Sequence, residues 1–126
     1  MKKTVLVFEP RDAQRSAIES LAAEQLHAHL HAFANKHTLE AVLREKLRAH
    51  VMALSIAGRE SQDRALYLLP RLYPRTRAAD FIFIIPDGLD VQKVSRTASL
   101  YQIKQAHWLP MTASAQEVIN EINRYL

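Results

Sequence analysis

The sequence VMALSIAG, residues 51–58, is a run of apolar side chains that is interrupted at Ser55 and ends in the small residues Ala57 and Gly58. An unbroken apolar run is typical of a strand that helices cover on both faces of a parallel sheet. The segments TVLVF at 4–8 and DFIFII at 80–85 have the same character. We therefore predict that these three segments are the central strands of one sheet. Any chemistry should lie just past their carboxyl ends.

Two weaker apolar segments and five helical patterns complete the chain. We place the strand around Ser55 at 50–56. Two further strands are predicted at 29–34 (HLHAFA) and 107–111 (HWLPM). Apolar side chains at helical spacing follow each strand; the five stripes are Ile18/Leu21/Ala22/Leu26, Leu39/Val42/Leu43/Leu47, Leu66/Leu69/Leu72/Tyr73, Val91/Val94/Ala98/Tyr101 and Val118/Ile119/Ile122/Leu126. This alternation predicts a doubly wound, three-layer α/β/α sandwich with a five-stranded parallel sheet.

Three local signals mark the ends of helices and a turn. Pro70 lies inside the third helical pattern, where its missing N–H should kink the helix or end its regular part. The segment PDG at 86–88 predicts a turn after the fourth strand. Ser114 followed by Glu117 predicts a capping box at the start of the last helix.

The composition limits the classes of function. A chain of 126 residues is long enough for one core and too short for two, so we expect a single domain over 1–126. No stretch approaches the roughly 20 apolar residues of a membrane span, and the start of the chain lacks a signal peptide pattern. We therefore expect a cytoplasmic protein without a membrane partner. Because the chain has no cysteine, thiolate nucleophiles and thiolate metal sites are excluded.

Glycine-rich phosphate loops are also absent from the sequence. The chain contains two glycines, Gly58 and Gly88, which is too few for a P-loop or a dinucleotide-binding fingerprint. No serine stands in a nucleophile elbow. These absences argue against the enzyme classes that such motifs define.

The order and spacing of the segments resemble the receiver (CheY-like) domain of bacterial response regulators over nearly the whole chain. VLVFEPRDAQRSAIESL resembles the first strand and helix of that family, and VMALSIAGRESQDRALYLLPRL resembles its third strand, loop and third helix. FIFIIPDG and QAHWLPMTA resemble the fourth and fifth strands. The resemblance implies a flavodoxin-like strand order of 2-1-3-4-5 and a role in two-component signal transduction.

The phosphorylation pocket is where this sequence departs from the family. Receivers transfer a phosphoryl group from a histidine kinase to an aspartate after the third strand, using Mg²⁺, two acidic residues, a hydroxyl and a lysine. At these positions the resemblance places Glu9, Pro10, Ser55, Ile85 and Met111. A serine cannot form an acyl phosphate, and a lone carboxylate is a poor basis for the Mg²⁺ that neutralises the developing charge. We predict a degenerate pocket filled by side chains, with no catalytic residue, metal or cofactor.

Three other acidic residues could collect a cation in a different register. Asp12, Glu60 and Asp87 each lie near a predicted helix start. A carboxylate interacts favourably there with exposed N–H groups and the helix dipole. We interpret all three in that way.

Alternating histidines offer a second possible metal site. His27, His29 and His31 share one face of an extended strand, with His37 nearby in sequence, and imidazoles bind zinc and copper. An edge strand by itself supplies neither a tetrahedral ligand set nor second-shell support. We interpret these residues as the solvated outer face of an edge strand.

The net charge of +4 raises the question of an anionic partner. In this architecture the basic residues gather at the edge where strands begin and helices end; they are Arg44, Lys46, Arg48, Arg71, Arg75, Arg77, Lys104, Arg124, Lys2 and Lys3. Cations there complement helix dipoles. The alternative function is therefore an anion- or nucleic-acid-binding domain that uses this basic edge. Nucleic acid is the less favoured partner, because the sequence has no basic helix and no interleaved exposed aromatic residues.

Arg96, Tyr101 and Trp108 are the candidate partner surface. These residue types are enriched in protein-binding hot spots. In receivers, the surface made of the fourth helix, the fifth strand and the last helix commonly binds a partner or a second copy. Core packing of the two rings is the alternative. Our hypothesis is a non-phosphorylatable regulatory and protein-interaction module, not an enzyme, whose partner is another protein or itself as a homodimer.

Overall fold

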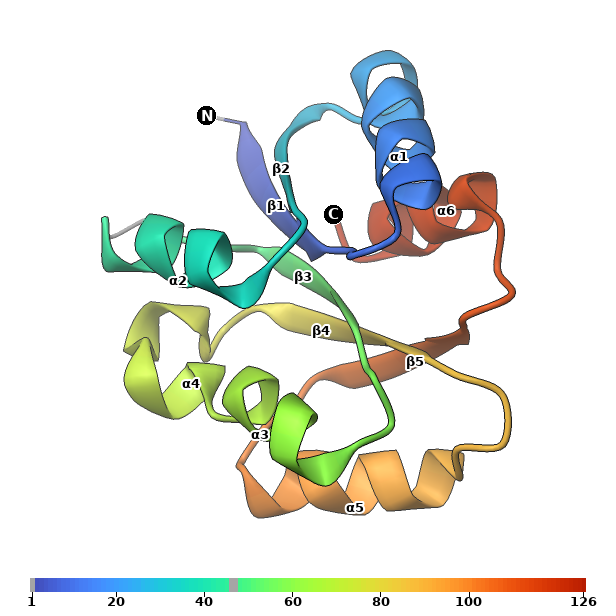
Figure 1. Ribbon diagram of the computed structural model, residues 1–126. Coiled ribbons are helices and arrows are strands. Elements are labelled where there is room, and N and C mark those ends of the chain that lie inside the picture. Colours follow the sequence, from blue (N-terminus) through green and yellow to red (C-terminus); the bar gives the residue numbers. More distant parts are fainter. Residues whose placement is uncertain (1, 46–47) are drawn as a thin grey trace.

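Five parallel strands form the central sheet of the molecule (Figure 1). The computed structural model describes residues 2–45 and 48–126, apart from the side chain of Glu60. The strands are β1 (Lys3–Phe8), β2 (Ala28–Phe33), β3 (Val51–Ser55), β4 (Asp80–Ile85) and β5 (Ala106–Pro110). Their order across the sheet is β2-β1-β3-β4-β5, so the three unbroken apolar segments are the central strands, as predicted.

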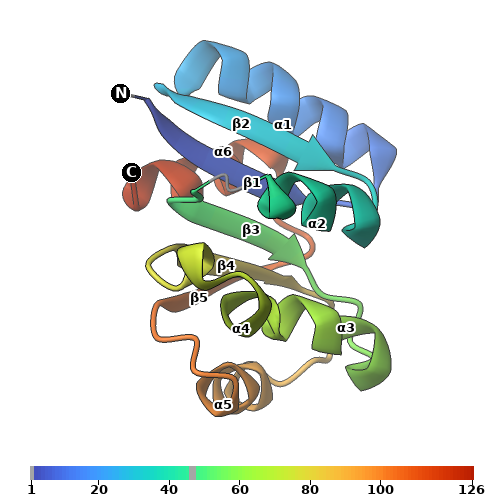
Figure 2. The same cartoon turned by 90° about the vertical axis from the view of Figure 1, so that its left-hand side faces the viewer.

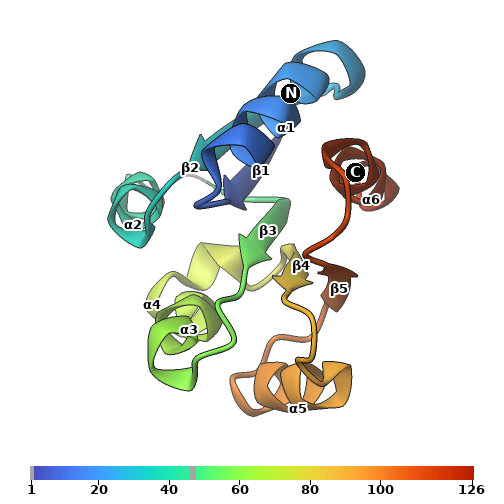
Figure 3. The ribbon, with the colours of Figure 1, turned by 45° about the vertical axis from the view of Figure 1, so that its right-hand side comes forward.

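Helices cover both faces of this sheet, as the views in Figures 2 and 3 show. On one face lie α1 (Asp12–Gln25) and α6 (Ala115–Arg124). On the other face lie α2 (Lys36–Arg44), α3 (Glu60–Tyr67), α4 (Leu69–Leu72) and α5 (Val91–Leu100). The doubly wound α/β/α sandwich is therefore confirmed.

The central strands contribute to two separate cores because their side chains alternate between the faces of the sheet. In β4, Phe81, Phe83 and Ile85 pack under α2 to α5, whereas Ile82 and Ile84 pack under α1 and α6. All five are buried. This double burial explains why the strands read as continuous apolar runs rather than as alternating ones.

The third helical pattern forms two helices instead of one. The chain leaves α3 at Tyr67, passes Leu68 and continues as the short α4, followed by a 3-10 turn at Pro74–Thr76. Pro70 is the second residue of α4 and has no N–H to donate to the preceding turn. The prediction that Pro70 kinks the helix or ends its regular part is confirmed, since the regular helix α3 ends at Tyr67. The predicted count of five helices is one too low among the described residues.

Most of the strand boundaries differ from the predicted ones by a single residue. The two edge strands begin one residue earlier than 29 and 107, and β3 is 51–55 rather than 50–56. The capping box of α6 is confirmed, because Ser114 Oγ accepts from the Glu117 N–H at 3.1 Å while Glu117 Oε1 accepts from the Ser114 N–H at 3.2 Å. Lys46 and Leu47 lie outside the described residues. In the described chain, each helix is too short or too polar to cross a membrane.

Candidate functional site

A cleft of about 500 Å³ opens at the carboxyl ends of β1 and β3. Its walls are largely apolar; the lining residues are Phe8, Glu9, Pro10, Arg11, Lys36, Ser55, Ile56, Ala57, Gln62, Asp63, Leu66, Pro86 and Met111. The prediction that side chains fill this mouth is therefore wrong. Ser55 and Ala57 are small, and they leave space at the end of β3 that larger residues would occupy.

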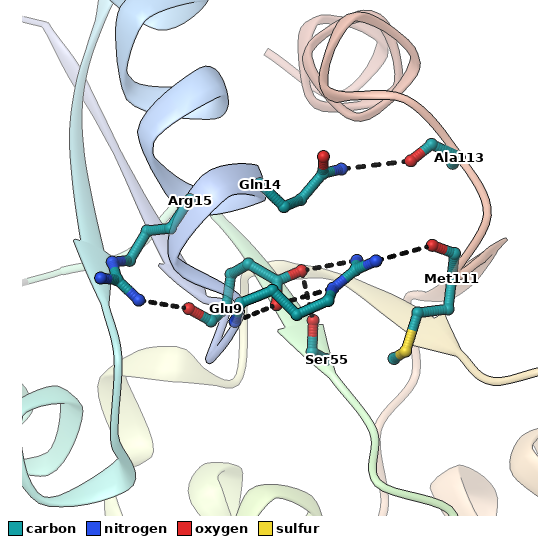
Figure 4. Close-up of polar contacts among 7 residues, drawn as sticks. Glu9, Gln14, Arg15, Ser55, Met111 and Ala113 are labelled. Carbon is teal, nitrogen blue, oxygen red and sulfur yellow. Dashed lines mark hydrogen bonds and ion pairs between the residues drawn. The ribbon is translucent and has the colours of Figure 1, made fainter.

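Glu9 is the central polar group of the cleft. Its side chain is fully buried at the end of β1, where an unpaired carboxylate would be costly. The carboxylate accepts from Ser55 Oγ at 3.1 Å and from the backbone N–H of Arg11 at 3.0 Å. The guanidinium of Arg11 adds Nη2 to Oε1 at 2.8 Å and Nε to Oε2 at 3.3 Å (Figure 4). Both carboxylate oxygens are therefore occupied by donors from the chain itself.

Arg11 is a residue of this candidate site that the sequence alone did not indicate. Besides its two-pronged contact with Glu9, its Nη1 donates to the carbonyl oxygen of Met111 at 3.1 Å. This contact ties the chain after β1 to the chain after β5, and Gln14 adds a parallel contact to the Ala113 carbonyl at 3.1 Å (Figure 4). The guanidinium side chain remains 43% exposed, so its charge lies at the cleft rim.

Four of the five predicted pocket residues line this cleft. Glu9, Pro10, Ser55 and Met111 are among its walls. Ile85 is buried in the core beneath α2 to α5 and does not line it. The structure thus brings together the residues after β1, β3 and β5, and it directs the last side chain of β4 elsewhere.

A second carboxylate, that of Asp63, lies in the cleft wall. It is buried, and its two oxygens accept from the backbone N–H groups of Ala57 at 2.7 Å and Gly58 at 3.0 Å. Gly58 has φ of +82°, a conformation that suits glycine. Asp63 therefore holds the loop between β3 and α3 in shape. Asp63 is the fourth residue of α3, and the sequence analysis did not single it out.

Lys36 closes the other side of the cleft. As the first residue of α2, it donates from Nζ to the carbonyl of Gln62 at 2.5 Å, so it links α2 to α3. The ammonium is the only lysine charge among the lining residues of the cleft.

Tyr67 lies behind the cleft, at the end of α3. Burial, with a smaller contribution from the Asp63 carboxylate, raises the pKa of Tyr67 to about 12. Its ring packs between Phe83 and Tyr101, at centroid distances of 5.3 and 5.9 Å. The neutral phenol is the form that this environment favours.

The other acidic candidates do not assemble. Asp12 is the first residue of α1 and pairs with Arg15 at 2.6 Å. Asp87 is exposed in the turn after β4, and Asp90, not Asp87, caps α5 by accepting from the Gln92 N–H at 2.8 Å. The Glu60 side chain lies outside the described part of the chain.

His27, His29 and His31 are exposed, the last two on edge strand β2, while Ala28, Leu30 and Ala32 pack toward α1. Within residues 2–45 and 48–126, no three histidine, aspartate or glutamate side chains come close enough together to hold a metal ion.

The residues of the candidate partner surface are exposed to different degrees. Arg96 is exposed on α5, and Trp108, on edge strand β5, is 41% exposed. Tyr101 is half-buried and stacks on Tyr67. Leu100, next to Tyr101, is 78% exposed and adds apolar area that the sequence reasoning did not single out.

Comparison with known proteins places this architecture among receiver domains. No family model matches the chain, and no curated protein matches it in sequence. Among solved structures, it is similar to the chemotaxis protein CheY4 of Vibrio cholerae, with a TM-score of 0.75, 12% identity and coverage of 100% of both chains. A response regulator receiver domain from Bermanella marisrubri gives a TM-score of 0.69 at 16% identity, covering 99% of this chain and 98% of that one.

A third similar structure is of a protein that is not described as a response regulator. A putative pilus assembly-related protein from Burkholderia pseudomallei has a TM-score of 0.68 at 12% identity, with 98% of this chain and 88% of that chain covered. The chain thus has the fold of the CheY-like receiver domains of response regulators, as its sequence resemblance implies. At these identities the likeness defines the fold and leaves the role of the site to its own geometry.

Proposed function

We propose that this chain is a receiver-like regulatory module that does not accept a phosphoryl group and that acts in signal transduction by binding another protein or a second copy. The observation that carries the proposal is the Glu9, Arg11 and Ser55 cluster. We also propose that it works in the cytoplasm, in keeping with its receiver fold.

The cluster supports the proposal because both oxygens of Glu9, which a bridging cation would need, already accept hydrogen bonds from the chain. Phosphoryl transfer depends on neutralising charge that develops on the phosphoryl oxygens, and in receivers Mg²⁺ on acidic residues does this. Here Glu9 already has both oxygens bonded to Arg11 and Ser55. A divalent ion would have to displace a tethered guanidinium from a fully buried carboxylate.

The other pocket positions also lack the required groups. Ser55 is a hydroxyl that donates to Glu9, and a phosphoserine is not an acyl phosphate. Met111 supplies a thioether side chain where the family has an ammonium, and Ile85 supplies a hydrocarbon buried in the core. Lys36 is the remaining ammonium, and it is bonded to the Gln62 carbonyl on the α2 side of the cleft.

Incubation with acetyl phosphate, and separately with beryllofluoride, each with Mg²⁺, tests the proposal. We expect no mass increase, no change in the fluorescence of Trp108 and no change in Tm, while an active receiver treated in parallel responds to both reagents. A saturable, Mg²⁺-dependent shift in this chain would contradict the proposal. The Ser55→Ala variant then tells whether Ser55 is the modified residue.

A further inference from the structure

A second hollow, of about 280 Å³, lies at the opposite end of the molecule from the Glu9 cleft. It is lined by α4, by the segment before β4 and by the loop between α5 and β5, which lie at the same end of the sheet in Figure 1. The lining residues are Pro70, Arg71, Arg77, Tyr101, Gln102 and Lys104. Three of these six side chains are cationic and none is acidic.

The three cations are largely free to bind a ligand. Arg77 donates from Nε to the Pro70 carbonyl at 3.0 Å, which fixes its position and leaves its two terminal nitrogens without a partner among the described residues. The guanidinium of Arg71 and the ammonium of Lys104 have no hydrogen bond or ion pair with any described residue. Like charges gathered around one hollow repel one another unless an anion lies between them.

Helix dipoles do not account for this cluster. Three of the last four carbonyls of α5 are already satisfied, because Thr97, Ser99 and Ala98 accept from the backbone N–H groups of residues 101, 102 and 103. The other helix at this site, α4, has four residues and a correspondingly small dipole. Stabilisation of a helix end is therefore a weak explanation for these cations.

Gln102 adds a sign of local strain at the same place. It has φ of +64° at the position after α5 where glycine is common. Among the described residues, it is the only one other than glycine with a positive φ. Glutamine there costs conformational energy and brings an amide donor to the rim of the hollow.

From this geometry we propose that the hollow binds the phosphate group of a small ligand, a phosphomonoester or a diphosphate. Arg71 and Arg77 present guanidinium groups, which match phosphate oxygens in pairs, and Lys104 adds a point charge. The concave shape favours one compact anion over the extended backbone of a nucleic acid. The proposal is independent of the proposed function. Of the basic residues predicted to gather at this edge of the sheet, it assigns ligand binding to Arg71, Arg77 and Lys104 and does not include Arg75.

Titration of the ¹⁵N-labelled chain with inorganic pyrophosphate tests the site. We expect saturable shifts confined to residues 70–78 and 101–105, with a Kd below about 1 mM at constant ionic strength. The Arg77→Gln and Lys104→Gln variants should each weaken binding about tenfold. Lys93→Gln, which removes the same charge from an exposed position on α5, should change the Kd less than about twofold.

Three results would overturn the proposal. The first is the absence of saturation, and the second is an equal loss of affinity in the Lys93→Gln control. The third is tighter binding of a short single-stranded DNA, with shifts that spread along the whole basic edge, which would assign the edge to nucleic acid instead. Unchanged spectra away from the site and an unchanged Tm in Lys104→Gln, an exposed loop residue, exclude misfolding as the cause of lost binding.

Discussion

The buried Glu9 carboxylate is paired with a cation of its own chain, the guanidinium of Arg11. A buried carboxylate is tolerated only when paired and hydrogen-bonded, and Glu9 receives four donated contacts from Arg11 and Ser55. Arg11 lies two residues away in the chain, so the pair forms with little loop-closure entropy. Under the proposed function, this one ion pair both stabilises the fold and prevents phosphoryl chemistry.

A double-mutant cycle measures that ion pair. Arg11→Met leaves a buried carboxylate unpaired and should lower the free energy of unfolding by about 2 kcal/mol, tempered by the partial exposure of Arg11. Glu9→Gln should cost ~1–2 kcal/mol, and the double variant should cost at least ~1 kcal/mol less than the sum. Urea unfolding at neutral pH provides all four values.

The exposed pair of Asp12 with Arg15 serves as the control, because Asp12→Asn should change stability by less than ~0.5 kcal/mol. Additive costs for Glu9 and Arg11 would show that the two side chains are energetically independent.

Ionisation of Tyr67 should make the free energy of unfolding depend on pH in the alkaline range. Its pKa in the folded chain is about 12, against 10 for an ordinary tyrosine, chiefly because of burial. Between pH 10 and about 12 the unfolded chain releases a proton that the folded chain keeps, so stability falls as pH rises through this window. Below pH 10 the contribution is intact.

Denaturant midpoints measured from neutral pH to above pH 11 should therefore decline less steeply in Tyr67→Phe than in the wild type. The decline should not vanish, because burial, together with a hydrogen bond to Glu121, also raises the pKa of Tyr125. Identical slopes for the two proteins would show that Tyr67 ionises as it does in the unfolded chain.

At the scale of elements, the end of α5 carries the local strain described above. Ile103 is buried and its N–H donates to the Ala98 carbonyl at 2.9 Å, while Gln102 turns the chain with φ of +64°. This is the geometry in which glycine has no steric penalty. Helix α5 therefore ends in a common C-terminal turn, but the left-handed position of that turn holds a glutamine instead of the favoured glycine.

Gln102→Gly should stabilise the fold by roughly 0.5–1 kcal/mol, the relief of left-handed strain less the greater entropy of glycine in the unfolded chain. Gln102→Ala keeps the side-chain penalty and should give no such gain. Thermal or urea unfolding distinguishes them. Destabilisation by the glycine variant would show that the Gln102 side chain contributes more to the fold than its backbone strain costs.

The elements themselves were the most predictable part of this protein. Strands such as β4 are unbroken apolar runs because both faces are buried, and Pro70 marks a helix end by its missing N–H. The candidate site was less predictable. Ser55 follows from the end of a predicted strand and Glu9 from the family resemblance, but the contacts of Arg11 with Glu9 and of Asp63 with two N–H groups form only once the loops are folded. Periodicity carries no signal for such contacts.

For the whole molecule, the proposed function requires an outer surface that binds a partner. The edge strand β5 exposes Trp108, and α5 exposes Arg96 and Leu100. Exposed aromatic and arginine side chains are typical binding hot spots. Tyr101, half-buried against Tyr67, contributes to this surface less than the sequence suggested.

Sedimentation velocity over a range of concentrations tests a homodimer through this surface. If the partner is a second copy, Trp108→Ala should weaken self-association at least tenfold, the loss of about 1.4 kcal/mol. Leu72→Ala removes a comparably exposed apolar side chain from α4 and should leave it unchanged. A wild-type chain that stays monomeric would direct the search to a different protein, with the same two variants as reagents.

The two-residue separation of Arg11 and Glu9 has one more consequence. An inorganic counterion exchanges with solvent, so its occupancy follows the concentration of that ion and can be abolished by chelators. A guanidinium joined covalently to the same backbone is present at fixed one-to-one stoichiometry and cannot be diluted away. We therefore expect the electrostatic balance at the mouth of this sheet to be the same in a metal-starved solution as in a metal-rich one.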